Sequence, residues 1–72
     1  GKNVIVDFHD GDSLLIARNM NGLNITSAAD VAHHVTDIDG NAVITLGHET
    51  ITLLNITAED IHANPTGYFH VQ

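Results

Sequence analysis

The chain has 72 residues, 43% of them apolar, and its nine acidic and two basic side chains give a formal charge of −7. A chain of this length forms one domain, residues 1–72, with little stability to spare, and its acidity argues against nucleic acid and anionic membranes as partners. It has no cysteine, so a metal, an oligomer partner or the rest of a longer polypeptide must supply extra stability. Its longest apolar runs are far too short for a membrane span.

The first part of the chain predicts two strands joined by a turn. Residues 4–8 alternate apolar side chains on one face, as a strand does. The turn His9–Asp12 contains Gly11, which can take the positive φ of a tight hairpin, and residues 13–17 form the return strand. Residues 18–24 are rich in asparagine and predict a loop.

The middle of the chain predicts a helical turn followed by a second hairpin. Ser27–Asp30 has a Ser or Thr cap before an acid in the first turn. Residues 31–38 predict a strand with no clean apolar face, which favours an edge position. The dipeptide Asp39-Gly40 is the strongest hairpin signal in the sequence and should join that strand, antiparallel, to residues 42–46.

The last part predicts a strand, a helical turn and a final strand. Residues 50–54 alternate Thr with Ile and Leu, which suits a half-exposed pleated surface. Thr57–Asp60 repeats the cap followed by acids, and residues 68–71 form a short strand after the break at residues 64–67. The sequence therefore predicts an all-β roll or sandwich of about six short strands with one or two helical turns. The predicted inward side chains are Val4, Val6, Phe8, Leu14, Ile16, Leu23, Ile25, Val43 or Ile44, Leu46, Ile51, Leu53, Ile56, Ile61 and Phe69.

An internal repeat underlies this pattern. The tetrad Leu-Asn-Ile-Thr occurs at residues 23–26 and again at residues 54–57, each time after two β-like runs and before a capped acidic segment. We expect two strand-turn-strand units, at about residues 4–31 and 42–61, with Leu23 and Leu54 in equivalent buried positions.

Three stretches resemble a known family. Residues 6–14 resemble the "DF-x-x-GD-x-L" strand-turn-strand of bacterial RTX (hemolysin-type calcium-binding) proteins. Residues 41–61 are similar to the "T-V-I-x-L-G … T-I-T-L-x-G-V-T-x-x-D-L" segment near the C-terminus of these type I-secreted proteins, and residues 68–71 resemble their terminal "D-F-x-F" strand. The calcium-binding nonapeptide G-G-x-G-x-D is absent from the chain.

The resemblance implies a non-catalytic β module of a secreted bacterial protein. Such a module would belong to a larger secreted polypeptide and would respond to calcium. It would support the folding of that polypeptide, the capping of a β-roll, or type I export. The alternatives are a small-molecule or carbohydrate-binding β module and a self-associating structural domain that forms homo-oligomers. No Ser-His-Asp arrangement, phosphate loop or enclosed carboxylate pair occurs, so we do not expect an enzyme.

The acidic turns are the candidate metal site. Hard oxygens from Asp10, Asp12, Asp37 and Asp39 on glycine-containing turns could converge on one calcium ion and relieve the repulsion among nine acids. Residues 37–41 have alternate-oxygen spacing, but no Glu follows at the EF-hand distance. Ordinary solvated turns are the alternative. The six histidines have two interpretations, ordinary surface positions or ligands of a zinc or nickel ion. They are His9, His33, His34, His48, His62 and His70.

Overall fold

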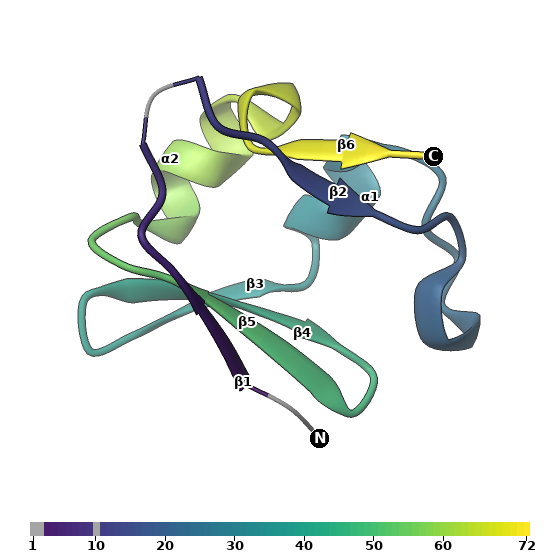
Figure 1. Cartoon of the computed structure of the whole chain (residues 1–72), viewed down its shortest axis with the longest axis horizontal. Coiled ribbons are helices and arrows are strands. Elements are labelled where there is room, and N and C mark those ends of the chain that lie inside the picture. Colours follow the sequence, from purple (N-terminus) through teal and green to yellow (C-terminus); the bar gives the residue numbers. More distant parts are fainter. Residues whose placement is uncertain (1–2, 10) are drawn as a thin grey trace.

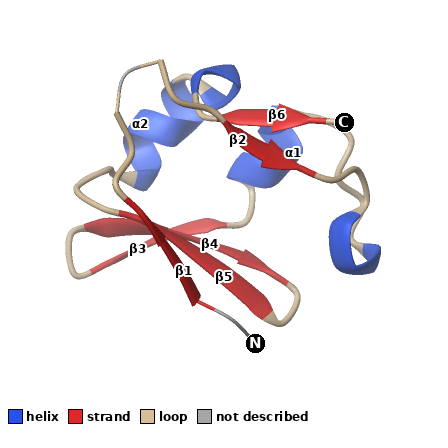
Figure 2. Ribbon diagram, viewed as in Figure 1, coloured by secondary structure: helices blue, strands red, loops and turns tan. Residues whose placement is uncertain are grey.

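The computed structural model describes the backbone of residues 3–9 and 11–72, and side chains for residues 6–9 and 11–72. The described chain forms two β-sheets and two short α-helices that pack against them (Figures 1 and 2). The elements are β1 (Asn3–Val6), β2 (Leu14–Ile16), the 3-10 turn η1 (Met20–Gly22), α1 (Ala28–Ala32), β3 (Val35–Ile38), β4 (Asn41–Leu46), β5 (Glu49–Leu53), α2 (Ala58–Ala63), the 3-10 turn η2 (Pro65–Gly67) and β6 (Phe69–Val71). The larger sheet has the strand order β1-β5-β4-β3, and the smaller one pairs β2 with β6.

Two tight hairpins build most of the larger sheet. Asp39 and Gly40 form the loop between β3 and β4, with φ angles of 53° and 81°. Two positive φ angles in a two-residue loop are typical of a type I′ turn, whose twist matches that of the flanking strands. Gly47, with φ 67°, begins the equally short loop between β4 and β5. The predicted hairpin at Asp39-Gly40 and the edge position of β3 are confirmed.

The hairpin predicted at His9–Asp12 is wrong. Gly11 does have a positive φ of 90°, but β1 and β2 belong to different sheets. β1 pairs in parallel with β5, so that Val6 lies beside Leu53, and β2 pairs in parallel with β6. Parallel partners are joined by long crossovers, so local turn chemistry does not indicate them.

The two helices begin where the sequence predicts caps. The hydroxyl of Ser27 accepts a hydrogen bond from the Asp30 amide at 3.2 Å, and that of Thr57 accepts one from the Asp60 amide at 3.1 Å. The strand predicted from residue 31 is wrong in its first part, because α1 continues to Ala32 and β3 begins only at Val35. The fold is therefore strand-rich but mixed, with both strands and helices contributing to its core.

The core lies between the two sheets and the helices. It includes seven of the predicted inward residues, while five buried residues in or near α1, β3 and β4 were not predicted. Val43, the stated alternative to Ile44, is buried but is not part of this core cluster. The side chain of Val4 lies outside the described part. Leu23 and Leu54 are both half-buried, whereas Leu53 is completely buried. The buried predicted residues are Ile16, Ile25, Val43, Ile44, Leu46, Leu53, Ile61 and Phe69, and the unpredicted ones are Ala28, Val31, Ala32, Val35 and Ala42.

Candidate functional site

A cleft of about 480 Å³ lies between the two chain segments that connect the larger sheet to the smaller one. Phe8, His9 and Gly11 line it from the connection between β1 and β2. Ile56 and Tyr68, with Asn64 and Gly67, line it from the connection between β5 and β6. Its volume falls within the range of small-molecule sites.

Two aromatic rings meet in the cleft. The ring centroids of Phe8 and Tyr68 lie 5.1 Å apart with an interplanar angle of 32°. Both side chains are half-buried and pack against the core. Phe69, the third aromatic residue, follows Tyr68 directly but is buried in the core, and its ring centroid lies 6.4 Å from that of Tyr68. The fold thus gathers two aromatic residues that are far apart in the sequence.

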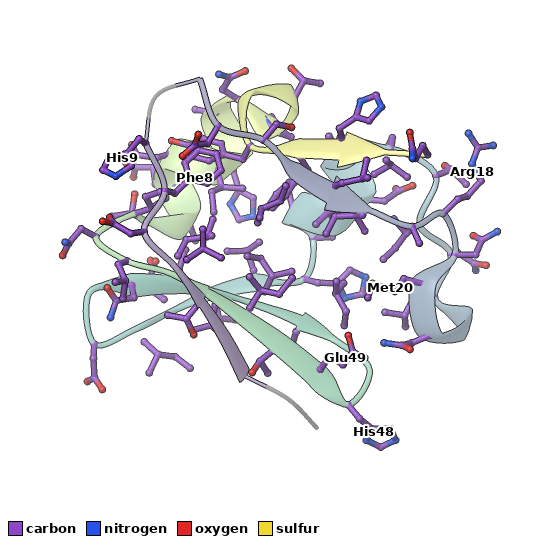
Figure 3. The ribbon with its side chains drawn as sticks, viewed as in Figure 1. Phe8, His9, Arg18, Met20, His48 and Glu49 are labelled. Atoms are coloured by element: carbon purple, nitrogen blue, oxygen red, sulfur yellow. The ribbon has the colours of Figure 1, made fainter. Side chains whose placement is uncertain are left out.

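The polar side of the cleft is an acid-histidine turn. Nε2 of His9 lies 3.5 Å from Oδ2 of Asp7, and both side chains are mostly exposed. The His9 amide donates to Oδ2 of Asp12 at 2.9 Å, and the Asp12 amide donates back to the His9 carbonyl at 3.0 Å. These two hydrogen bonds fix the backbone next to Phe8. Figure 3 shows Phe8 and His9 together, on the opposite side of the molecule from Arg18 and His48.

The opposite wall of the cleft depends on a glycine. A Cβ atom at Gly67 would collide with the side-chain amide of Asn64. The Gly67 amide also donates to the Asn64 carbonyl at 3.0 Å, which closes the turn. Asn64 and Gly67 were predicted only as a chain break, because a sequence does not reveal which loop faces an aromatic pair.

The predicted calcium ligands lie in two different parts of the chain. Asp10 lies outside the described residues, Asp12 lies in the connection between β1 and β2, and Asp37 and Asp39 belong to the β3–β4 hairpin. Oδ1 of Asp37 accepts a hydrogen bond from the Ala58 amide at 2.7 Å, so this carboxylate holds the start of α2. Among the described residues, no three or more His, Asp or Glu side chains form a group that could hold a metal ion. Calcium binding therefore stays a prediction.

The histidines do not gather at one site in the described part of the chain. His62 on α2 has a structural contact, because its Nε2 lies 2.8 Å from the carbonyl oxygen of Ala32 at the end of α1. The side chains of His33, His48 and His70 are exposed, and His34 is half-buried. The contact of His62 ties the two helices to each other.

One carboxylate has a shifted pKa. The backbone amide and the hydroxyl of Thr26 both donate to Oδ2 of Asp30 at 2.9 Å. These hydrogen bonds, the backbone one first, stabilise the charged form and lower the pKa of Asp30 below its usual value of 3.8. Asp30 is therefore a folding element at the start of α1.

Comparison with known proteins gives no relative. No family model matches the chain, and no curated protein or solved structure matches it. Within the described residues, the helices are too short to cross a membrane.

Proposed function

We propose that this domain is a non-catalytic module of a secreted bacterial protein that caps a parallel β-roll in the same polypeptide. The support comes from the chain path rather than from any single residue. A β-roll consists of stacked coils, each of which gives one strand to each of two parallel sheets. Stacked repeats need a terminal unit that closes the exposed end.

Two stretches of this chain follow such a path. The first runs from β1 in the larger sheet through residues 7–13 to β2 in the smaller sheet. The second runs from β5 through α2 and η2 to β6, and each of its strands is parallel to the matching strand of the first. Figure 1 shows both connections at the same end of the molecule. This parallel pairing in both sheets is the observation that carries the proposal.

The two ends of this stack differ. Beyond β5, the antiparallel strands β4 and β3 extend the larger sheet. β3 has the exposed acid Asp37, next to the exposed apolar Ile38, and a charged side chain on an edge strand discourages pairing with another chain. In the described structure, β1 is the other edge of the larger sheet, and β2 has β6 as its partner on one side only. A preceding coil could therefore add one strand beside β1 and one beside β2.

The hydrogen bonds of β2 define a test position. The Leu14 amide donates to the Tyr68 carbonyl at 2.8 Å, and the Ile16 carbonyl accepts from the Gln72 amide at 3.1 Å. Backbone groups alternate in direction along a strand, so the N–H of Leu15 points away from β6. The Leu15 side chain is 62% exposed. Leu15→Pro would thus remove a donor from the outer edge while it spares the bonds to β6.

The test is a fusion of several G-G-x-G-x-D nonapeptides to the N-terminus of this chain. Circular dichroism would follow calcium-dependent folding of the repeats alone, of the wild-type fusion and of the Leu15→Pro fusion. We expect the wild-type domain to lower the calcium concentration needed for folding, and Leu15→Pro to reduce this effect. Leu15→Ala is the matched control. Equal calcium midpoints for the repeats alone and for the wild-type fusion would contradict the capping proposal.

The calcium response of the domain itself is a separate measurement. A site with a Kd of about 10⁻⁴ to 10⁻³ M would stabilise the fold by about 1.4 kcal/mol when calcium stands at ten times Kd. Thermal melting in excess EDTA and in millimolar calcium at equal ionic strength measures this. An unchanged Tm would assign Asp12, Asp37 and Asp39 to ordinary turn and capping roles.

A further inference from the structure

We infer that the cleft between the two connections binds a neutral saccharide ring, a function beyond the capping role. Capping would use the outer edges of β1 and β2, whereas the cleft is lined by residues 8, 9 and 11 on one side and by residues 56, 64, 67 and 68 on the other. The two uses therefore involve different surfaces.

The lining matches the chemistry of a sugar. A pyranose ring has an apolar face of C–H groups and an edge of hydroxyls. The rings of Phe8 and Tyr68 pack against each other with centroids 5.1 Å apart, and the parts of them that line the cleft provide apolar surface for that face. The amide of Asn64 and the imidazole of His9 provide both donors and acceptors for hydroxyls. The tyrosine hydroxyl is a third such group.

One wall of the cleft leaves its backbone open. Gly11 lines the cleft without a side chain, so a ring can approach the backbone there, whereas the side-chain amide of Asn64 occupies the space beside Gly67. The conformation of the first wall is held by the paired hydrogen bonds between His9 and Asp12. These bonds restrain the backbone of His9 and Asp12 before a ligand binds, which lowers the entropy lost on binding.

Charge selects a neutral ligand over an anionic one. Asp7 lies 3.5 Å from His9, and Asp12 bonds to the His9 amide beside the cleft. The chain as a whole has a charge of −7, which repels phosphates, sulfates and uronic acids. A quaternary ammonium ion is the competing ligand, because aromatic rings and nearby acids attract cations.

The sequence offers a direct readout. Tyr68 is the one tyrosine in the chain, which contains no tryptophan, so tyrosine fluorescence reports on this cleft alone. Titration with glucose, cellobiose and chitobiose, followed by this fluorescence and by ¹H–¹⁵N NMR, tests the inference. We expect saturable shifts with at least one of these sugars, centred on residues 8–9, 64 and 67–68.

Variants assign the binding to the rings. Tyr68→Ala should weaken binding by about tenfold, the scale of one aromatic contact, whereas Tyr68→Phe should retain most of it, as judged by NMR. Leu15→Ala, at an exposed position away from the cleft, should bind like the wild type, and NMR dispersion shows whether each variant is folded. Phe8→Ala provides a second test if Tyr68→Ala does not fold. No saturable shift with any of the three sugars, or saturation by choline instead, would overturn the inference.

Discussion

The contact between Asp37 and α2 predicts the clearest effect of a single substitution on stability. Oδ1 of Asp37 on β3 accepts a hydrogen bond from the Ala58 amide in the first turn of α2, with 2.7 Å between nitrogen and oxygen. A hydrogen bond to a charged group contributes about 1.5–3 kcal/mol. Because this bond is exposed to solvent, we expect Asp37→Ala to cost about 1–2 kcal/mol, the scale of a lost helix cap.

Thermal and urea denaturation followed by circular dichroism measure this loss. For a domain of this size, the expected cost lowers Tm by about 4–16 °C. Asp37→Asn keeps an acceptor oxygen and removes the charge, so it should fall between the wild type and Asp37→Ala. Asp39→Asn is the matched control, because it removes a charge from the same hairpin at a residue with φ 53°, a conformation that Asn tolerates.

The control also accounts for the charge of the whole chain. With nine acids and two basic residues, removal of any carboxylate relieves repulsion and tends to stabilise the fold. The reasoning would be refuted if Asp37→Ala were as stable as Asp39→Asn. It would also be refuted if Asp37→Asn and Asp37→Ala were equally destabilised, because the acceptor would then have no role.

Four further substitutions test other contacts. The pKa of Asp30 is lower in the folded chain than in the unfolded chain. The stabilisation by its carboxylate is therefore present above the unfolded pKa and is lost as pH falls through the folded pKa. Urea midpoints across the acid range should depend less on pH in Asp30→Asn than in the wild type, and an unchanged dependence would contradict this. In urea unfolding, Leu53→Ala should lower the free energy of unfolding by about 2–5 kcal/mol. Leu54→Ala, at a half-buried position, should lower it by less, and the reverse order would contradict the burial of Leu53 in the core. His62→Ala should cost about 0.5–1.5 kcal/mol in the same assay, because the Ala32 carbonyl loses its partner, and a wild-type midpoint would exclude that role.

The candidate site was only partly visible in the sequence. The chain has three aromatic residues, Phe8, Tyr68 and Phe69, and nothing in their spacing places Phe8 beside Tyr68. Their contact depends on the parallel pairing of β2 with β6, which puts Tyr68 just before the strand beside Leu14. The same pairing buries Phe69. Distant strand pairing therefore decided which aromatic residues line the cleft.

The underestimated length of α1 has a physical explanation. Ala28, Val31, Ala32 and Val35 are spaced by three and four residues, a helical period that the two-residue alternation of residues 31–38 obscured. The first three lie on the buried side of α1, and Val35 begins β3. Small alanine side chains give a weak apolar signal, although they let α1 approach the core closely.

The sequence by itself determined the features that depend on neighbouring residues. Asp39-Gly40 adopts its turn because both positions tolerate positive φ, and Ser27 and Thr57 cap helices through amides three residues away. Only the tertiary structure decided that β1 pairs with β5 and β2 with β6. The physical reason is that a parallel partner is chosen by burial of side chains far away in the chain, and a short stretch of alternating residues fits many such partners equally well.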